Sequence, residues 1–336
     1  MIPQHGRGSG AAAACLALVL ATAAGAAEAP SLELVKTIRL QGKDGNLDHL
    51  AVDARGGRLF VANSPMNSLD VVDLKAGKLL KRVAGQRGIQ GIAYAQDLDR
   101  VYVGLGTGGF CNVFDGKKYG LLKTVKFKDD ADNVRYHART HRVYVAHAEK
   151  ALGVIDARTF KKLADIELPG DAESFQLEAG RPRLYLNTPS GGQVVVIDTD
   201  KNEVVKTYAL ERAGGNFPLA LDEANHRLLV GCRKEPMLVV LDSESGKEVA
   251  RLPIPGDTDD LYLDARHKRI YVSCGDGYLA VIRQADADHY ELVDKVATAK
   301  GARTCAFDPG MGRIYLAVPR QKGKDGPEIR VYQARR

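Results

Sequence analysis

The 336-residue chain has no tryptophan, and aromatic residues make up only 6% of it. Beyond the N-terminal 27 residues, no apolar run approaches the roughly 18 residues that a membrane-spanning helix needs. Charges of neither sign form a long block: 48 lysines and arginines are interspersed with 42 acidic residues, for a net charge of +6. This pattern fits a solvated surface as well as weak contact with an anionic partner, and it predicts no membrane span.

Several sequence motifs of common enzymes are also missing. The chain has no G-x-S-x-G, no H-E-x-x-H, no C-x-x-C-H and no P-loop, which removes the usual arguments for a serine hydrolase, a zinc protease, a covalent haem protein or a nucleotide hydrolase. The G-x-G-x-x-G match at 104–109 follows an expected strand, but no helix is expected after it, so we interpret it as a loop. A site assembled from distant segments would carry none of these motifs.

The N-terminal segment has the pattern of a secretory signal. His5 and Arg7 precede an apolar run at 11–24, and small residues follow at 24–27. We predict a cleaved signal peptide over 1–26 and therefore a periplasmic or secreted protein. Because the apolar run is short and rich in alanine, we do not expect it to act as an anchor.

Four cysteines follow this segment, all at or beside apolar strand segments: Cys111, Cys232, Cys274 and Cys305. An even number of cysteines in an oxidising compartment can form disulfides, but a large repeated fold does not need them. We expect buried free thiols. Cys274 and Cys305, on neighbouring repeats, form the only pair for which we consider a disulfide.

One short pattern recurs seven times: arginine, apolar, aromatic or leucine, apolar, small. The copies begin at Arg58, Arg100, Arg142, Arg183, Arg227, Arg269 and Arg313, at spacings of 41 to 44 residues. This period fits one four-stranded propeller blade better than a helical solenoid unit. We predict an all-β fold: one domain over 32–336, a seven-bladed β-propeller of four-stranded antiparallel blades.

The order of strands within the repeats also predicts how the ring closes. Each repeat has an inner strand A, the arginine-led strand B, a strand C that ends in aspartate in five repeats, and an outer strand D. The aspartates predict Asx-type turns into strand D. The chain ends after its seventh strand C, whereas an unmatched segment like strand D stands at 33–40. We predict that 33–40 pairs with 329–333 and closes the ring.

The B-strand signature, the terminal aspartate of strand C and the Thr/Ser-x-Gly-Lys-type turn resemble the YVTN-repeat family of extracytoplasmic seven-bladed β-propellers, the YncE-like proteins. The resemblance covers 32–336 and implies the fold. It implies no single reaction, because propellers of this kind include binding proteins, lactone hydrolases and cofactor-bearing enzymes.

Aligning the repeats on the arginine brings candidate site residues together at the start of strand A. Ten residues before it lie Asp48, Gln90, Asp132, Glu173, Phe217, Asp259 and Arg303, and nine before it lie His49, Gly91, Asn133, Ser174, Pro218, Asp260 and Thr304. Because strand A is innermost, we expect these side chains to crowd one mouth of the central channel. The family often has glycine at the second position, which only Gly91 keeps here.

Seven residues before the arginine lie four alanines together with Arg135, Gln176 and Tyr262. Buried polar groups need partners, so we expect Arg135 to pair with Asp132, Glu173 or Asp259. The predicted ligand-binding residues are Asp48, His49, Asp132, Asn133, Arg135, Glu173, Gln176, Asp259, Asp260, Tyr262 and Arg303. They could form an anion pocket, a Ca²⁺ or Mg²⁺ site with oxygen ligands, or a merely hydrated channel mouth.

These observations favour a monomeric periplasmic or secreted binding or scaffold protein. It would use the channel mouth and loops for a small molecule or a protein partner, with no catalytic residue or cofactor assigned. One alternative is a metal-dependent hydrolase of lactone-like substrates with its site in the channel. Another is single-stranded nucleic-acid binding, which the absence of tryptophan and the acidic mouth disfavour.

Overall fold

The computed structural model describes residues 1–3, 6, 31–148, 150–211 and 213–335. Apart from 1–3 and 6, the predicted signal peptide at 1–26 lies outside the described residues. Within the described ranges, no helix has the length and apolar character needed to cross a membrane.

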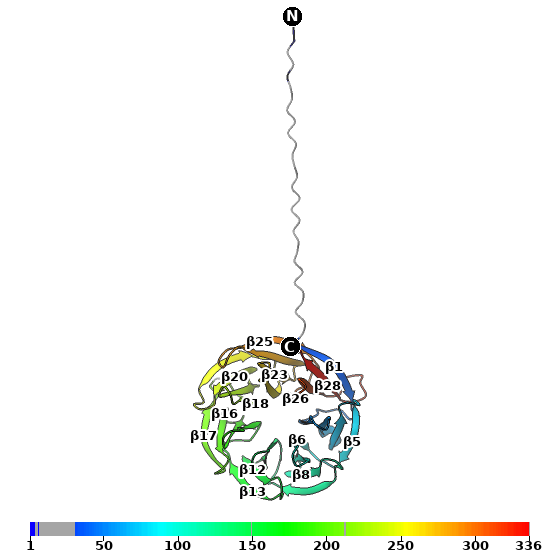
Figure 1. Ribbon diagram of the computed structural model, residues 1–336, viewed down its shortest axis with the longest axis vertical. Helices are drawn as coiled ribbons and strands as arrows, with labels where there is room; N and C mark the ends of the chain where they lie inside the picture. Colours follow the sequence, from blue (N-terminus) through cyan, green and yellow to red (C-terminus); the bar gives the residue numbers. More distant parts are fainter. Residues whose placement is uncertain (4–5, 7–30, 149, 212, 336) are drawn as a thin grey trace.

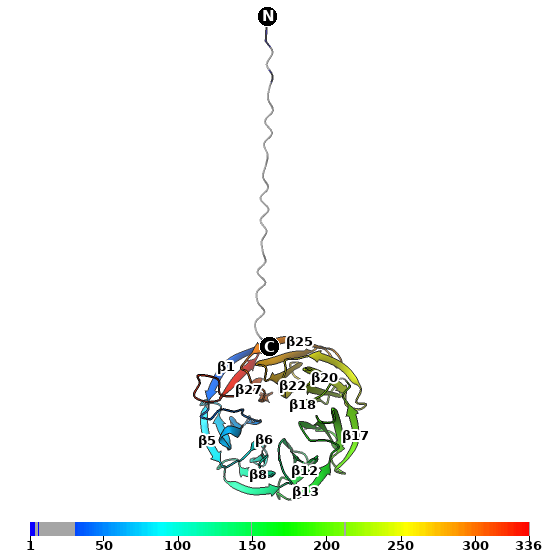
Figure 2. The ribbon, with the colours of Figure 1, turned by 180° about the vertical axis from the view of Figure 1, so that it is seen from behind.

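Seven four-stranded antiparallel sheets stand around a central channel, as predicted (Figure 1; Figure 2 shows the opposite face). From the channel outward, blades 1 to 6 are β2 (Leu50–Asp53), β3 (Arg58–Asn63), β4 (Ser68–Asp73), β5 (Lys78–Ala84); β6 (Ile89–Ala95), β7 (Arg100–Leu105), β8 (Phe110–Asp115), β9 (Leu121–Lys126); β10 (Val134–His137), β11 (Arg142–His147), β12 (Ala151–Asp156), β13 (Lys162–Glu167); β14 (Phe175–Leu177), β15 (Arg183–Thr188), β16 (Gln193–Asp198), β17 (Glu203–Ala209); β18 (Asn216–Asp222), β19 (Arg227–Cys232), β20 (Met237–Asp242), β21 (Glu248–Pro253); and β22 (Thr258–Asp264), β23 (Arg269–Cys274), β24 (Tyr278–Gln284), β25 (Tyr290–Ala297). A 3-10 turn, η1 (Ser64–Met66), follows β3.

Blade 7 combines the two ends of the chain. Its strands from the channel outward are β26 (Cys305–Asp308), β27 (Arg313–Val318), β28 (Glu328–Ala334) and β1 (Leu32–Arg39). The antiparallel register of β1 with β28 runs from Leu32 opposite Ala334 to Arg39 opposite Glu328. The Lys36 ammonium also donates to the carbonyls of Leu74 and Lys75 in blade 1. The predicted ring closure is therefore confirmed.

The arginine of strand B links neighbouring blades. The guanidinium of Arg142 donates to the Thr199 carbonyl at 2.5 Å, and that of Arg183 contacts the Glu244 carboxylate at 2.8 Å. Equivalent contacts to the next blade come from Arg58, Arg100 and Arg227. The recurring arginine thus has a structural role. It is the first residue of strand B, and its charge-assisted contact stabilises the packing of one blade against the next.

The aspartate at the end of strand C forms the predicted turn. In blade 1, Asp73 accepts a hydrogen bond from the backbone N–H of Ala76 at 2.8 Å. The same arrangement recurs at Asp115, Asp156, Asp198 and Asp242. These turns direct the chain into strand D and place it at the outer wall of the ring.

The four cysteines of the described chain are buried and free, as predicted. Burial raises the pKa of Cys111, Cys232 and Cys274 to about 12. These thiols remain protonated at neutral pH, and they act as small apolar side chains of the blade cores.

Every outer strand carries a β-bulge, which the sequence did not lead us to expect. In each case the pairing of strand D with strand C shifts by one residue, and the extra residue is apolar. These residues are Val35, Leu80, Leu122, Leu163, Val205, Val249 and Val293. A bulge interrupts the regular hydrogen-bond ladder of an edge strand, and a regular ladder is a template for pairing with another chain.

Deleting Leu122 tests whether the bulges protect the outer strands from pairing with another chain. Leu121 pairs with Phe114 and Lys123 with Val113, so the deletion restores a regular ladder without changing the register on either side. We expect a larger fraction of dimers and higher oligomers than in the wild type, measured by size-exclusion chromatography with light scattering. The substitution Leu122→Ala, which keeps the bulge, is the control. Equal oligomer content in all three proteins would contradict the edge-protection role.

Candidate functional site

The seven A strands surround the channel, and their side chains divide it into two cavities. The first, the mouth cavity, has a volume of about 140 Å³ and opens at the start of strand A. The second, the chamber, has a volume of about 420 Å³ and lies further along the same strands. Since a strand advances about 3.3 Å per residue, positions ten and seven before the arginine differ by roughly 10 Å in depth.

The mouth cavity brings together six of the predicted residues: Asp48, His49, Asp132, Glu173, Asp259 and Arg303. It also contains Gln90 and Phe217 from the same aligned position. Arg233 completes the cluster, and sequence reasoning missed it. Arg233 follows β19, strand B of blade 5, so an alignment of strand A positions could not reveal it.

Asp259 is held between two arginines. The Arg233 guanidinium lies 2.5 Å from one carboxylate oxygen, and Arg303 Nε lies 3.0 Å from the other. The Arg233 guanidinium also stacks on the Phe217 ring, 3.5 Å from its centroid. Burial raises the pKa of Asp259 to about 6, and the two positive charges oppose that shift. Asp257 also lies 3.2 Å from Arg303 and 3.9 Å from Arg233. Two carboxylates therefore face two guanidinium groups, and this part of the mouth cavity offers little net charge to a ligand.

His49 lies at the boundary between the two cavities. Its Nδ1 is 3.5 Å from Asp260, and its Nε2 is 3.8 Å from Asp48. Burial alone would lower the pKa of His49, but the carboxylates of Asp260 and Asp48 outweigh burial and raise this pKa to about 10. The imidazole is therefore positively charged at neutral pH, which suits neither a general base nor a metal ligand.

The two remaining carboxyls of the mouth cavity have unusually high pKa values. Burial raises the pKa of Asp132 to about 7, with the charge of His49 acting in the opposite direction. Burial, together with the negative charge of Asp132, raises the pKa of Glu173 to about 8. At neutral pH Asp132 is therefore close to half-protonated, and Glu173 is mostly protonated and uncharged.

These shifts predict that the protein loses stability as pH rises. A group with a raised pKa in the folded state binds more protons there than in the unfolded state, so its stabilising effect is present at low pH and is lost through the folded pKa. We expect the midpoint of thermal unfolding to fall by about 5 °C or more between pH 6 and pH 9 at fixed ionic strength. The double variant Asp132→Asn/Glu173→Gln should show a smaller fall, measured by calorimetry; an identical fall would contradict the assignment.

The sequence predicts a Ca²⁺ or Mg²⁺ site among the oxygen-bearing residues at the mouth. Four of the predicted ligands, Asp48, Asp132, Glu173 and Asp259, line the mouth cavity. Among the residues that the structure describes, no group of three or more His, Cys, Asp or Glu side chains is arranged to hold a metal ion. The cation site stays a prediction. Asn133 is buried and lines neither cavity, and its side-chain oxygen has no hydrogen-bond partner among the described atoms.

The predicted pairing of Arg135 with Asp132, Glu173 or Asp259 is wrong. Within the described chain, the hydrogen bond of the Arg135 guanidinium is to the carbonyl of Val134 at 3.0 Å, and no carboxylate lies within ion-pair distance. The physical reason is depth, because Arg135 lies three residues further along strand A and lines the chamber. The Arg135 side chain does lie in the channel, but it lines the chamber and not the mouth cavity.

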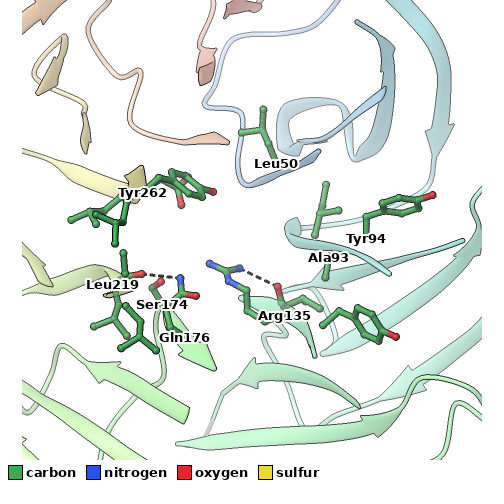
Figure 3. Close-up of a pocket in the computed structure, with 16 residues that line it drawn as sticks. Leu50, Ala93, Tyr94, Arg135, Ser174, Gln176, Leu219 and Tyr262 are labelled. Atoms are coloured by element: carbon green, nitrogen blue, oxygen red, sulfur yellow. Dashed lines mark hydrogen bonds between the residues drawn. The ribbon is translucent and has the colours of Figure 1, made fainter. Parts of the chain in front are cut away.

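Arg135, Gln176 and Tyr262 project into the chamber from blades 3, 4 and 6 (Figure 3). Gln176 donates to the Leu219 carbonyl at 2.9 Å, and the Tyr262 hydroxyl donates to the Cys305 carbonyl at 3.1 Å. Both bonds reach the next blade. Asp260, expected at the mouth, also lines the chamber.

Comparisons with known proteins agree with this fold. No protein-family model matches the chain. Over 194 residues it is 26% identical to the uncharacterised protein YncE of Salmonella typhi and 25% identical to that of Salmonella typhimurium, in each case covering 56% of this chain and 54% of the relative. The chain thus spans about half the length of the curated relatives it matches.

Solved structures show the same architecture at lower identity. A chain of Kuenenia stuttgartiensis hydrazine synthase matches with a TM-score of 0.73 at 18% identity, covering 83% of this chain and 94% of that chain. The RRP9 WD40 repeats match with a TM-score of 0.78 at 10% identity, covering 91% and 99%. At these identities the likeness shows the fold alone.

The protein is a seven-bladed β-propeller with a central channel divided into an acidic mouth cavity and a larger chamber. The seven blades and the YncE matches together support a YncE-like propeller family.

Proposed function

We propose that this YncE-like propeller is a binding protein that holds a small molecule in the chamber of its central channel. The observation that carries the proposal is a cavity of about 420 Å³ lined by both apolar and polar side chains. A concave site of this size that combines apolar walls with a few convergent polar groups is the usual form of a small-molecule site. Two lining positions, Ala93 and Ala220, have small side chains that leave the space open.

Non-catalytic binding fits the chemistry of the surrounding groups. The buried His49 is held in its charged form between carboxylates, and Asp259 is bound by two arginines. The metal-dependent hydrolase has less support, since no group of three or more His, Cys, Asp or Glu side chains among the described residues is arranged to hold a metal ion. Single-stranded nucleic acid has less support, because the chain has no tryptophan on which bases could stack.

The pattern at 1–26 supports a periplasmic or secreted location for this binding role. We further propose that the monomer is the functional form, because the lining of the chamber consists of A-strand residues around the single central channel of the ring.

Filling the chamber tests the proposal. Ala93→Phe places an aromatic ring in the cavity, and Leu80→Phe adds the same ring at the outer wall, where Leu80 is 50% exposed. We expect wild type and Leu80→Phe to bind benzoate or benzamide in saturation-transfer NMR, and Ala93→Phe to lose the signal while remaining folded by circular dichroism. Binding that survives in Ala93→Phe, or no binding by the wild type, would contradict a ligand site in the chamber.

A further inference from the structure

The charge balance of the chamber is uneven. Among its lining residues, only Arg135 and Asp260 carry a formal charge at neutral pH. Asp260 is already satisfied, because it accepts a hydrogen bond from the backbone N–H of Cys305 at 2.9 Å and lies 3.5 Å from the charged His49 ring. The negative charge in the chamber is therefore compensated, and the positive charge of Arg135 is the one left over.

Arg135 has unused hydrogen-bonding capacity. A guanidinium carries five N–H donors, and here one of its nitrogens donates to the Val134 carbonyl. Its other contact is with the Phe175 ring, 5.7 Å from the ring centroid, which leaves the outer edge of the guanidinium directed into the cavity (Figure 3). A half-buried charge with so few partners is costly, and a planar carboxylate matches it in charge and in geometry.

The other polar groups of the chamber are committed to the protein. The amide of Gln176 and the hydroxyl of Tyr262 donate to backbone carbonyls of the next blades. Burial raises the pKa of Tyr262 well above its ordinary value, so this hydroxyl stays neutral. The remaining wall includes the partly exposed side chains of Tyr94, Leu221 and Leu263, which suit an apolar body rather than a strongly hydrated ion.

We propose that the chamber binds a small organic carboxylate, with its carboxylate on the Arg135 guanidinium and its apolar part against the side chains of Tyr94, Leu221 and Leu263. This inference rests on the proposed function, and it names the class of ligand. An inorganic oxyanion would satisfy Arg135 but would leave the apolar wall facing a hydrated ion, so the organic anion fits the whole cavity better.

Isothermal titration calorimetry with benzoate, benzamide and inorganic phosphate tests the inference. Benzoate and benzamide have the same shape and differ in charge, so their ratio of affinities isolates the contribution of Arg135. A hydrogen bond to a charged group contributes about 1.5–3 kcal/mol, which corresponds to roughly 10- to 100-fold in affinity. We expect wild type to bind benzoate at least about 10-fold more tightly than benzamide.

The variant Arg135→Gln should bind the two probes equally, whereas Arg139→Gln, which changes an exposed arginine of the same blade, should keep the wild-type ratio. Equal affinities in wild type, or an unchanged ratio in Arg135→Gln, would overturn the inference. Phosphate binding as tight as benzoate would also overturn it, in favour of an inorganic oxyanion site. If both aromatic probes bind equally and Ala93→Phe abolishes both, the binding function stands and only the carboxylate assignment fails; if neither binds, both fail.

Discussion

Replacing Ile38 by alanine should lower the free energy of unfolding by about 3 kcal/mol, because it removes a fully buried side chain at the point where the ring closes. Ile38 belongs to β1 and packs in one cluster with Leu59 and Val61 of blade 1 and with Ile329 of blade 7. It therefore fills the seam between the first and last blades. A cavity there weakens both the blade that β1 completes and the contact that shuts the ring.

Leu34→Ala is the matched control for this change. Leu34 lies on the same strand but is 48% exposed, so its loss should change stability by no more than about 0.5 kcal/mol. The measurement is urea unfolding followed by circular dichroism, since the chain has no tryptophan to report by fluorescence. Equal effects of the two substitutions would mean that β1 does not contribute to closure.

Asp70→Ala should destabilise the protein by about 3 kcal/mol, because it leaves the partly buried Arg82 without its carboxylate partner. The Asp70 carboxylate is fully buried in blade 1. It accepts two hydrogen bonds from Arg82, at 2.6 and 2.7 Å, and one each from Asn63 and Ser68 at 2.9 Å. All four donors lose their acceptor at once.

The double variant Asp70→Ala/Arg82→Met separates the cost of the unpaired charge from the loss of packing. Removing both partners of a buried ion pair is usually far less harmful than removing one. We expect the double variant to regain most of the stability lost in Asp70→Ala, measured by the same urea unfolding. A double variant as unstable as the single one would show that the unpaired arginine is not the cause.

The fold could be predicted because its determinants are local and repeated. The arginine-led strand, the aspartate that ends strand C and the unmatched segment at 33–40 each have a meaning that does not depend on distant contacts. Seven copies of one pattern fix the number of blades. The bulge at Leu122 escaped prediction because an apolar residue in strand D looks the same whether it pairs regularly or is the extra residue.

For the site, the sequence predicted only how far along the channel each residue lies. Counting back from the arginine placed Asp132 and Glu173 at the mouth and identified Arg135 as an unusual cation in the channel. The alignment could not say which side chains meet across the ring. It assigned Arg135 to carboxylates that lie in the other cavity, and it missed Arg233, which reaches Asp259 from the end of a B strand. Contacts between blades depend on side-chain reach, which a repeat alignment does not contain.

A crystal structure of the protein grown with 4-bromobenzoate tests the central claim most directly, because the anomalous signal of bromine locates the probe without reference to any expected site. We expect one bromine peak inside the chamber, with the carboxylate within hydrogen-bond distance of the Arg135 guanidinium. A bromine peak confined to the outer wall or the acidic mouth cavity, with the chamber holding only water, would contradict it.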